Sequence, residues 1–286
     1  TYKSEVKPTW CPGCGDYAVL NALQHALTEL QLEPWNVLIV SGIGCSSNLP
    51  HFLSTYGFHA IHGRAVAVAE GAKLANPDLH VIVTGGDGDG YGIGVGHFIH
   101  AMRRNIDLTY IVMNNEIYGR TTGQASPTSE VGMKTKSTPV VGVIENPIDP
   151  IALALSSGAT YVARAFSGDV KQMSDLVAKG IEHHGFSLID ALSPCVTYNK
   201  INTYDFFRKR VYDLGKEGHD PTDLKAAFLK ALEWPVMQRD RIPLGLFYRN
   251  ETLPTYEDLE PAYKKGNPVR QMLGIQNADE ILNEFL

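Results

Sequence analysis

Several features that mark other protein classes are scarce or missing in this sequence. The 286 residues contain only four cysteines and carry a net charge of −6. They include no apolar run of the roughly 18 residues that a membrane span needs. The acidic balance gives no general positive field of the kind that nucleic-acid-binding proteins use. The amino terminus, TYKSEVKPTWCPGCG, lacks the apolar core of a signal peptide, so we expect a cytoplasmic protein. In that compartment the cysteines are expected as metal ligands, redox groups or buried thiols rather than as disulfides.

Strand-like and helix-like segments alternate over most of the chain. Apolar runs typical of buried parallel strands cover residues 36–41, 160–166 and 186–192, and two more end in the motifs GGDGDG and NNEIYG. Helical periodicity covers residues 16–32, 64–76, 91–105, 151–157 and 169–184. This alternation predicts a doubly wound parallel sheet of the α/β class, with residues 186–192 as its last strand.

The pattern breaks in three other stretches. Residues 48–63 read as a polar, aromatic loop, and residues 119–150 show no periodicity, which in a compact domain indicates a functional segment. Residues 200–286 are polar, with one clear helix around residues 221–232 and an extended stretch, IPLGLFYRNETLP. We therefore predict a domain over residues 1–199 and a C-terminal extension over residues 200–286. The extension is expected to pack on its own domain or on a partner subunit.

Residues 79–124 form the centre of this pattern. They read as strand, glycine-rich turn, helix starting near Tyr91, and strand. In open parallel sheets, ligands bind in a crevice at the carboxyl ends of the strands. Because Asp87 and Asn115 follow the two neighbouring strands, we expect both side chains at the same crevice.

These residue types suit a diphosphate ester bound with Mg²⁺. Such a ligand needs a carboxylate and neutral oxygens for the cation, close backbone N–H groups, and a helix N-terminus near the negative charge. Asp87, Asn115 and the backbone carbonyl of Ile117 can supply the oxygens, and the glycines permit the close approach. Gly-Asp-Gly is also a common turn, so an unrelated loop is the alternative. The spacing of GDG and NN resembles the thiamine diphosphate motif.

The four cysteines precede the first helix or follow strands. Cys11 and Cys14 form CPGC, Cys45 lies in GIGCSS, and Cys195 lies in SPC. We expect them at the same edge of the sheet as Asp87. Four thiolates can hold a structural zinc ion or an iron–sulfur cluster, and the spacing alone does not separate the two. For Cys45 and Cys195, a buried thiol is a further alternative. A thiamine site beside the cysteines favours the cluster, because thiamine intermediates are electron-rich.

Taken together, these motifs resemble the β subunits of the 2-oxoacid:ferredoxin oxidoreductases. The resemblance runs in order through PTWCPGCGDY, GIGCSS, HAIHGRA, GGDGDGYGIG, MNNEIYGRTTGQASPT and PCVTYN. It implies the diphosphate-binding half of the thiamine-diphosphate-binding fold. It also implies oxidative decarboxylation of a 2-oxoacid with coenzyme A as co-substrate, or the reverse reductive carboxylation. Electrons would pass singly through a cluster to ferredoxin.

The same resemblance implies a set of site residues. Asp87, Asn115 and the Ile117 carbonyl would hold Mg²⁺ and thiamine diphosphate. The residues expected to border the cofactor are Ile43, Gly44, Cys45, Ser46, His62, Gly88, Asp89, Gly119 and Arg120. One 4Fe–4S cluster would be held by Cys11, Cys14, Cys45 and Cys195. For Asp89 the alternative is a turn or helix cap, and for His62 it is an ordinary loop histidine.

One expected role has no residue in this chain. Enzymes of this type ionise the aminopyrimidine of the cofactor with a glutamate from a separate pyrimidine-binding domain. We find one α/β domain, so the glutamate should come from an α subunit, in an αβ or (αβ)₂ assembly. By resemblance, that subunit also carries most contacts to substrate and coenzyme A. The chain alone is expected to be inactive.

Arg120 is the main departure from the family pattern. Relatives often carry an uncharged residue there, in YGLTKGQ, whereas here Thr122 replaces the lysine of that motif. An arginine near the reacting centre can pair with a distal carboxylate, which favours 2-oxoglutarate as substrate. The alternatives are that Arg120 contacts phosphate or the partner chain, and that the enzyme uses pyruvate or a broad range of 2-oxoacids.

Two other functions remain open from the residues. One is a non-redox thiamine enzyme subunit with a structural zinc site. The other is a zinc-stapled binding module without catalysis. A cluster signal, thiamine diphosphate binding and zinc content separate the three hypotheses.

Overall fold

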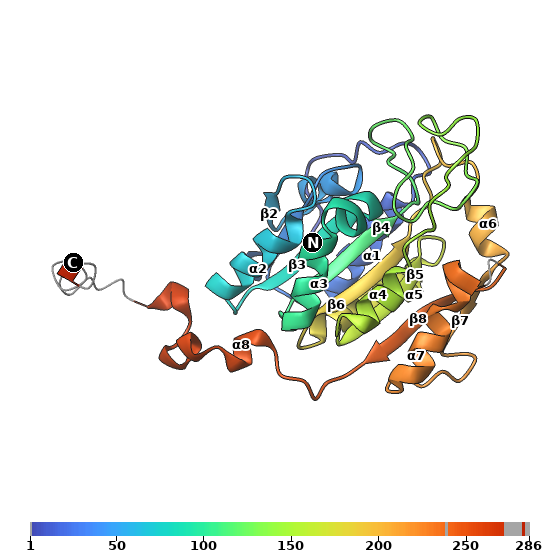
Figure 1. Ribbon diagram of the computed structural model, residues 1–286. Coiled ribbons are helices and arrows are strands. Elements are labelled where there is room, and N and C mark those ends of the chain that lie inside the picture. Colours follow the sequence, from blue (N-terminus) through green and yellow to red (C-terminus); the bar gives the residue numbers. More distant parts are fainter. Residues whose placement is uncertain (1, 238–239, 272–281, 284–286) are drawn as a thin grey trace.

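In the described part of the chain, eight strands form one sheet with helices on both of its faces (Figure 1). The computed structural model describes residues 2–237, 240–271 and 282–283. The strands are β1 (Val37–Ser41), β2 (Tyr56–His59), β3 (His80–Gly86), β4 (Thr109–Asn114), β5 (Tyr161–Phe166), β6 (Ser187–Leu192), β7 (Val211–Asp213) and β8 (Ile242–Arg249). Their order across the sheet is β2-β1-β3-β4-β6-β5-β8-β7.

The described helices are α1 (Asp16–Glu29), α2 (Ala65–Ala75), α3 (Val95–Arg104), α4 (Pro150–Ser156), α5 (Val170–Glu182), α6 (Tyr204–Arg208), α7 (Leu224–Ala231) and α8 (Tyr256–Leu259). The longer of these helices form two layers, one on each face of the sheet. Successive side chains of a strand point to opposite faces. In β4, Ile111 and Met113 pack with α1 and α5, whereas Tyr110 and Val112 pack with the layer that contains α2, α3, α4 and α7. Burial on both faces explains why the central strands are apolar throughout.

The predicted fold class is confirmed. The first six strands in this order, β2-β1-β3-β4-β6-β5, are parallel to one another. The doubly wound order places β2 on one side of β1 and β3 on the other. A crevice forms where the connections from neighbouring strands diverge in this way. The loops that follow β1, β3, β4 and β6 carry Cys45, Asp87, Asn115 and Cys195, so the topology brings the predicted site residues to this edge.

Two details of the sequence prediction were wrong. The segment assigned to a loop, residues 48–63, contains strand β2, whose four residues are all exposed at the edge of the sheet. The strand has only four residues, one of them a glycine, and its aromatic residues Tyr56 and Phe58 are exposed, so it gives only a weak strand signal. Residues 186–192 are also not the last strand, because β8 follows and pairs antiparallel with β5, and β7 pairs with β8. The extended stretch predicted in this region is confirmed as β8.

The chain after β8 runs back along the domain towards α2 (Figure 1). The Tyr263 hydroxyl donates a hydrogen bond to the Leu74 carbonyl at 2.6 Å, and the Arg270 guanidinium pairs with Asp78 at 2.6 Å. These contacts fasten the segment to the end of α2. None of the helices described is long and apolar enough to cross a membrane.

Candidate functional site

A cavity of roughly 660 Å³, open solvent included, lies at the carboxyl ends of β1, β3 and β4. Its lining contains every residue predicted to border the cofactor and all three predicted magnesium ligands. These residues are Ile43, Gly44, Cys45, Ser46, His62, Asp87, Gly88, Asp89, Asn115, Ile117, Gly119 and Arg120. We call it the Asp87 cavity.

Asp87 supplies a buried carboxylate to this cavity. Only 1% of its surface is exposed, and Thr128 donates a hydrogen bond to its Oδ2 at 2.6 Å. Burial raises the pKa of Asp87, while hydrogen bonds from Ser126 and Thr128 oppose the rise. A carboxylate that is costly to ionise when alone gains most from a neighbouring cation.

Asn115 and Ile117 lie in a tight turn after β4. The side-chain oxygen of Asn115 accepts a hydrogen bond from the Ile117 N–H at 3.1 Å. Glu116, between them, adopts a positive φ of 57°, which is uncommon for a residue with a side chain. The side chain of Ile117 is buried against Met133 and Val143, so only its backbone is free to serve the cavity. An amide oxygen has a second lone pair, so Asn115 can accept this bond and still offer an oxygen.

The glycine-rich turn has a different local structure from the one predicted. A short helical turn, Gly88–Ile93, comes directly after Asp87 and is kinked at Gly92, and α3 begins only at Val95. A Cβ on Gly88 would lie 2.1 Å from the Tyr118 ring, and one on Gly90 would lie 2.1 Å from the Tyr110 hydroxyl. These glycines are therefore required by tyrosines packed against the turn.

Asp89 is enclosed by protein. Its Oδ1 accepts hydrogen bonds from His62 Nδ1 at 2.6 Å, from the Gly63 N–H at 2.8 Å and from the Ile43 N–H at 3.0 Å. Its Oδ2 is buried without a hydrogen-bond partner. The residue therefore holds neighbouring loops and offers no exposed oxygen to the cavity. Because His62 uses Nδ1 for this bond, its Nε2 is the nitrogen left for the cavity.

A second cavity, of roughly 690 Å³ with open solvent included, contains all four cysteines in its lining. We call it the cysteine cavity. All four thiols are free of disulfides. Burial raises the pKa of Cys45 to about 11, and the Arg120 guanidinium opposes this rise. Burial also raises the pKa of Cys14. Across the described residues, no three His, Cys, Asp or Glu side chains are grouped closely enough to hold a single metal ion.

The two cavities share one wall. Cys45, Asn115, Gly119 and Arg120 line both of them. A Cβ built on Gly119 would lie 3.4 Å from the Cys195 sulfur and 3.9 Å from the Cys45 sulfur. The wall is therefore thin at this glycine. Arg120 is exposed and lines both cavities, a position beside the cysteines that the sequence did not predict.

A buried polar network lies beneath Asp87, and sequence reasoning missed it. The Thr128 hydroxyl is 3.0 Å from the side-chain oxygen of Asn114, whose amide donates to Asp190 at 3.1 Å. Arg164 Nε in turn donates to Asp190 at 2.9 Å, and both of these residues are fully buried. Trp234, from the C-terminal region, stacks on the guanidinium at 4.7 Å. The one available signal was a charged residue inside each of two otherwise apolar strands.

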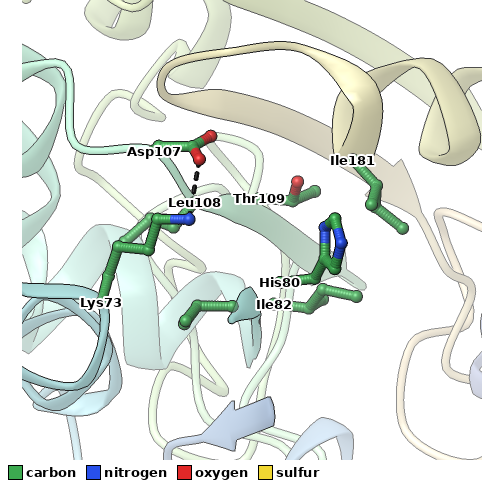
Figure 2. A pocket seen from close by; sticks show the side chains of 8 residues that line it. Lys73, His80, Ile82, Asp107, Leu108, Thr109 and Ile181 are labelled. Atoms are coloured by element: carbon green, nitrogen blue, oxygen red, sulfur yellow. Dashed lines mark ion pairs between the residues drawn. The ribbon is translucent and has the colours of Figure 1, made fainter. Parts of the chain in front are cut away.

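A smaller cavity lies at the other end of the strands, where residues at the amino ends of β3 and β4 line it (Figure 2). Its Lys73 pairs with Asp107 at 2.7 Å and donates to the carbonyls of Pro77 and Leu79. The lysine charge is thus already satisfied within the fold. This cavity lies at the amino ends of the strands, away from the two cavities described above.

Comparison with known proteins identifies the family. Residues 42–191 match the thiamine pyrophosphate enzyme C-terminal TPP-binding domain, and residues 195–265 match the C-terminal part of the pyruvate ferredoxin oxidoreductase β subunit. The 2-oxoacid:ferredoxin oxidoreductase β subunit of Saccharolobus solfataricus is 48% identical, over 96% of this chain and 95% of its own length. The 2-oxoglutarate oxidoreductase subunit KorB of Mycobacterium tuberculosis is 48% identical over 73% of this chain and 55% of its own.

A solved structure agrees with these relatives. The 2-oxoglutarate:ferredoxin oxidoreductase of Magnetococcus marinus, with 2-oxoglutarate, coenzyme A and succinyl-CoA bound, has a TM-score of 0.89. It is 43% identical in sequence, and the match covers 99% of this chain and 94% of that one. The resemblance drawn from the sequence motifs is confirmed. With its thiamine pyrophosphate-binding domain, this chain belongs to the β subunits of the 2-oxoacid:ferredoxin oxidoreductases, a family of oxidoreductase enzymes.

Proposed function

We propose that the chain holds thiamine diphosphate with Mg²⁺ in the Asp87 cavity and a 4Fe–4S cluster in the cysteine cavity. The observation that carries the proposal is the shared wall formed by Cys45, Asn115, Gly119 and Arg120. Electron transfer between two groups requires that they lie close together. A wall as thin as the one at Gly119 meets this requirement.

The residues of the Asp87 cavity fit the metal and the diphosphate. Mg²⁺ prefers a carboxylate or two, neutral oxygens and substrate phosphates. Asp87 would supply the carboxylate, and Asn115 and the Ile117 carbonyl would supply the neutral oxygens. His62 would direct Nε2 towards the cofactor, since Asp89 holds its other nitrogen. Thiamine diphosphate supplies the carbanion chemistry of decarboxylation, and the protein's part is to hold and orient it.

The residues of the cysteine cavity fit a polynuclear cluster. Cys11, Cys14, Cys45 and Cys195 are four thiols set around one cavity, the number that a 4Fe–4S cluster takes. Burial holds Cys14 and Cys45 in the neutral thiol form, so a bound metal must displace their protons. Arg120 is close enough to Cys45 to offset part of the negative charge that a loaded cluster would carry.

We further propose 2-oxoglutarate as the substrate, with succinyl-CoA and CO₂ as products. An exposed guanidinium at the mouth of the Asp87 cavity can accept a distal carboxylate in a bidentate pair. Relatives named for 2-oxoglutarate, and the solved structure with that substrate bound, support this choice. Oxidation of the decarboxylated substrate would release two electrons, and a cluster held by the four cysteines would pass them one at a time to ferredoxin. A pyruvate or broad-specificity enzyme is the alternative.

The complete enzyme requires a partner. The chain provides one cofactor-binding domain, so an α subunit would supply the activating glutamate and most contacts to substrate and coenzyme A. The β-subunit designation of its relatives implies such a partner. We infer a cytoplasmic location, because ferredoxin-linked chemistry and four free thiols suit a reducing compartment.

The experiment is a comparison of substrates with the anaerobically purified αβ complex. Reduction of methyl viologen in the presence of coenzyme A is measured with 2-oxoglutarate and with pyruvate. A higher kcat/KM for 2-oxoglutarate is expected. A preference for pyruvate would remove the substrate assignment. A colourless, zinc-containing preparation without viologen reduction would remove the redox function itself.

A further inference from the structure

Asp89 connects three loops that are far apart in the sequence. It lies in the turn after β3, and its Oδ1 accepts hydrogen bonds from Ile43 in the loop after β1 and from His62 and Gly63 in the loop after β2. The residue is 2% exposed. The three donors satisfy Oδ1 without any contribution from solvent.

The packing around Asp89 is as closely defined as its hydrogen bonds. A Cβ on Gly42 would lie 1.9 Å from Asp89 Oδ2, so the loop after β1 can approach only because residue 42 is a glycine. A Cβ on Gly63 would lie 2.5 Å from Ile93, on the turn that contains Asp89. Both neighbouring loops are thus fitted against the turn, and Asp89 is at the centre of the contact.

The loop after β1 belongs to both cavities. Ile43 and Gly44 line the Asp87 cavity, and Cys45 lines both. On its other side the loop is held by Trp10, whose Nε1 donates to the Cys45 carbonyl at 2.7 Å. Asp89 fixes the backbone N–H of Ile43, two residues before the cysteine.

We propose that Asp89 is a positioning residue that couples the two cavities. It fixes the loop that carries Cys45 and the imidazole of His62 to the turn next to Asp87. A ligand that orders this turn therefore also restrains Cys45 and slows the loss of a cluster held by it. This inference rests on the proposed function, since it requires a cluster in the cysteine cavity and Mg²⁺–thiamine diphosphate in the other.

The test measures cluster loss in the αβ complex. Iron release to a chelator is followed from the visible absorbance, with and without saturating Mg²⁺–thiamine diphosphate. In the wild type the cofactor should slow iron release by roughly fivefold or more, a typical size for coupling between sites. In Asp89→Leu, which has a similar shape but no oxygen to accept the three bonds, the rates with and without cofactor should be equal.

Two variants separate the positioning role of Asp89 from direct cofactor binding and from a general effect on the turn. Asp87→Asn should weaken cofactor binding, so that a higher concentration of Mg²⁺–thiamine diphosphate is needed to slow iron release. Tyr91→Phe lies in the same turn and loses only the buried bond to Asp190, and it should keep the protection by cofactor. Thermal midpoints are recorded for all variants. If Asp89→Leu keeps the protection at saturating cofactor, or if the loaded wild type shows none, the coupling is refuted. If the wild type holds no cluster, the proposed function fails instead.

Discussion

Thr128 donates a hydrogen bond to Asp87 at 2.6 Å, although 41 positions separate the two residues in the chain. Both side chains are buried. The threonine lies in the long segment without periodicity, residues 119–150, and this contact gives that segment a role. Removing a group that orients a metal ligand from behind typically weakens metal binding by about 10- to 100-fold.

Replacement of Thr128 by valine is therefore expected to weaken Mg²⁺ binding by about tenfold, because Asp87 loses the donor that orients its carboxylate. Thr128→Ser retains a hydroxyl and should bind Mg²⁺ nearly as well as the wild type. Calorimetric titration of Mg²⁺ into the αβ complex, with excess thiamine diphosphate, measures both. Equal affinities of the valine and serine variants would show that the hydroxyl has no such role.

Arg120 is expected to select the substrate. In Arg120→Leu, the kcat/KM for 2-oxoglutarate should fall by about ten- to a hundredfold, the effect of a lost charge-assisted hydrogen bond. The value for pyruvate, which has no distal carboxylate, should change little. Steady-state viologen reduction with both substrates gives the ratio. A parallel loss for the two substrates would assign Arg120 to the cofactor or the cluster.

Gly119 is expected to be required for cluster binding. Its missing side chain would point at Cys195 and Cys45, at 3.4 and 3.9 Å from the two sulfurs. Gly119→Val should therefore reduce the iron content of the anaerobically purified complex. Gly71→Ala is the matched control, because nothing lies within 4 Å of that position in α2. Full iron content in Gly119→Val would mean that the wall tolerates a side chain.

Asp149 is expected to make stability depend on pH. Burial outweighs the Arg164 guanidinium at 3.9 Å and raises the pKa of Asp149 to about 6, above the unfolded value of 3.8. The folded state thus favours the protonated acid. Its stabilising contribution is complete below the unfolded pKa and is lost as the pH rises through about 6.

The free energy of unfolding of the wild type, relative to Asp149→Asn, should therefore fall by roughly 1 kcal/mol between pH 5 and pH 7. Asparagine also caps helices well, so the N-cap of α4 is retained. Asp223→Asn changes the exposed cap of α7 and serves as the control. Denaturant unfolding at the two pH values measures the difference. A difference that does not change with pH would contradict the raised pKa.

The sequence alone was sufficient to predict which residues lie together at the carboxyl ends of the strands. Asp87 and Asn115 were expected together because each follows a buried strand of a parallel sheet, and the same reasoning brought the four cysteines to that edge. Strand ends converge whatever the details of packing, so such predictions need only the pattern and the topology.

Contacts between distant segments could not be predicted in the same way. The three donors to Asp89 come from two other loops, and nothing in the local sequence pairs them with it. The ion pair of Arg164 with Asp190, and the stacking of Trp234 on it, join strands to a region that the pattern left as an extension. Strand β2 was missed because it has only four residues, one of them a glycine, which is a weak signal for a strand.

Under the proposed function, thiamine diphosphate and the iron–sulfur cluster would face each other across the wall that the two cavities share. The most direct test is EPR spectroscopy of the anaerobically purified αβ complex, frozen after addition of 2-oxoglutarate without ferredoxin. A reduced-cluster signal that depends on 2-oxoglutarate and disappears in Asp87→Asn is the expected result. A cluster that can be reduced by dithionite but never by substrate would contradict the account.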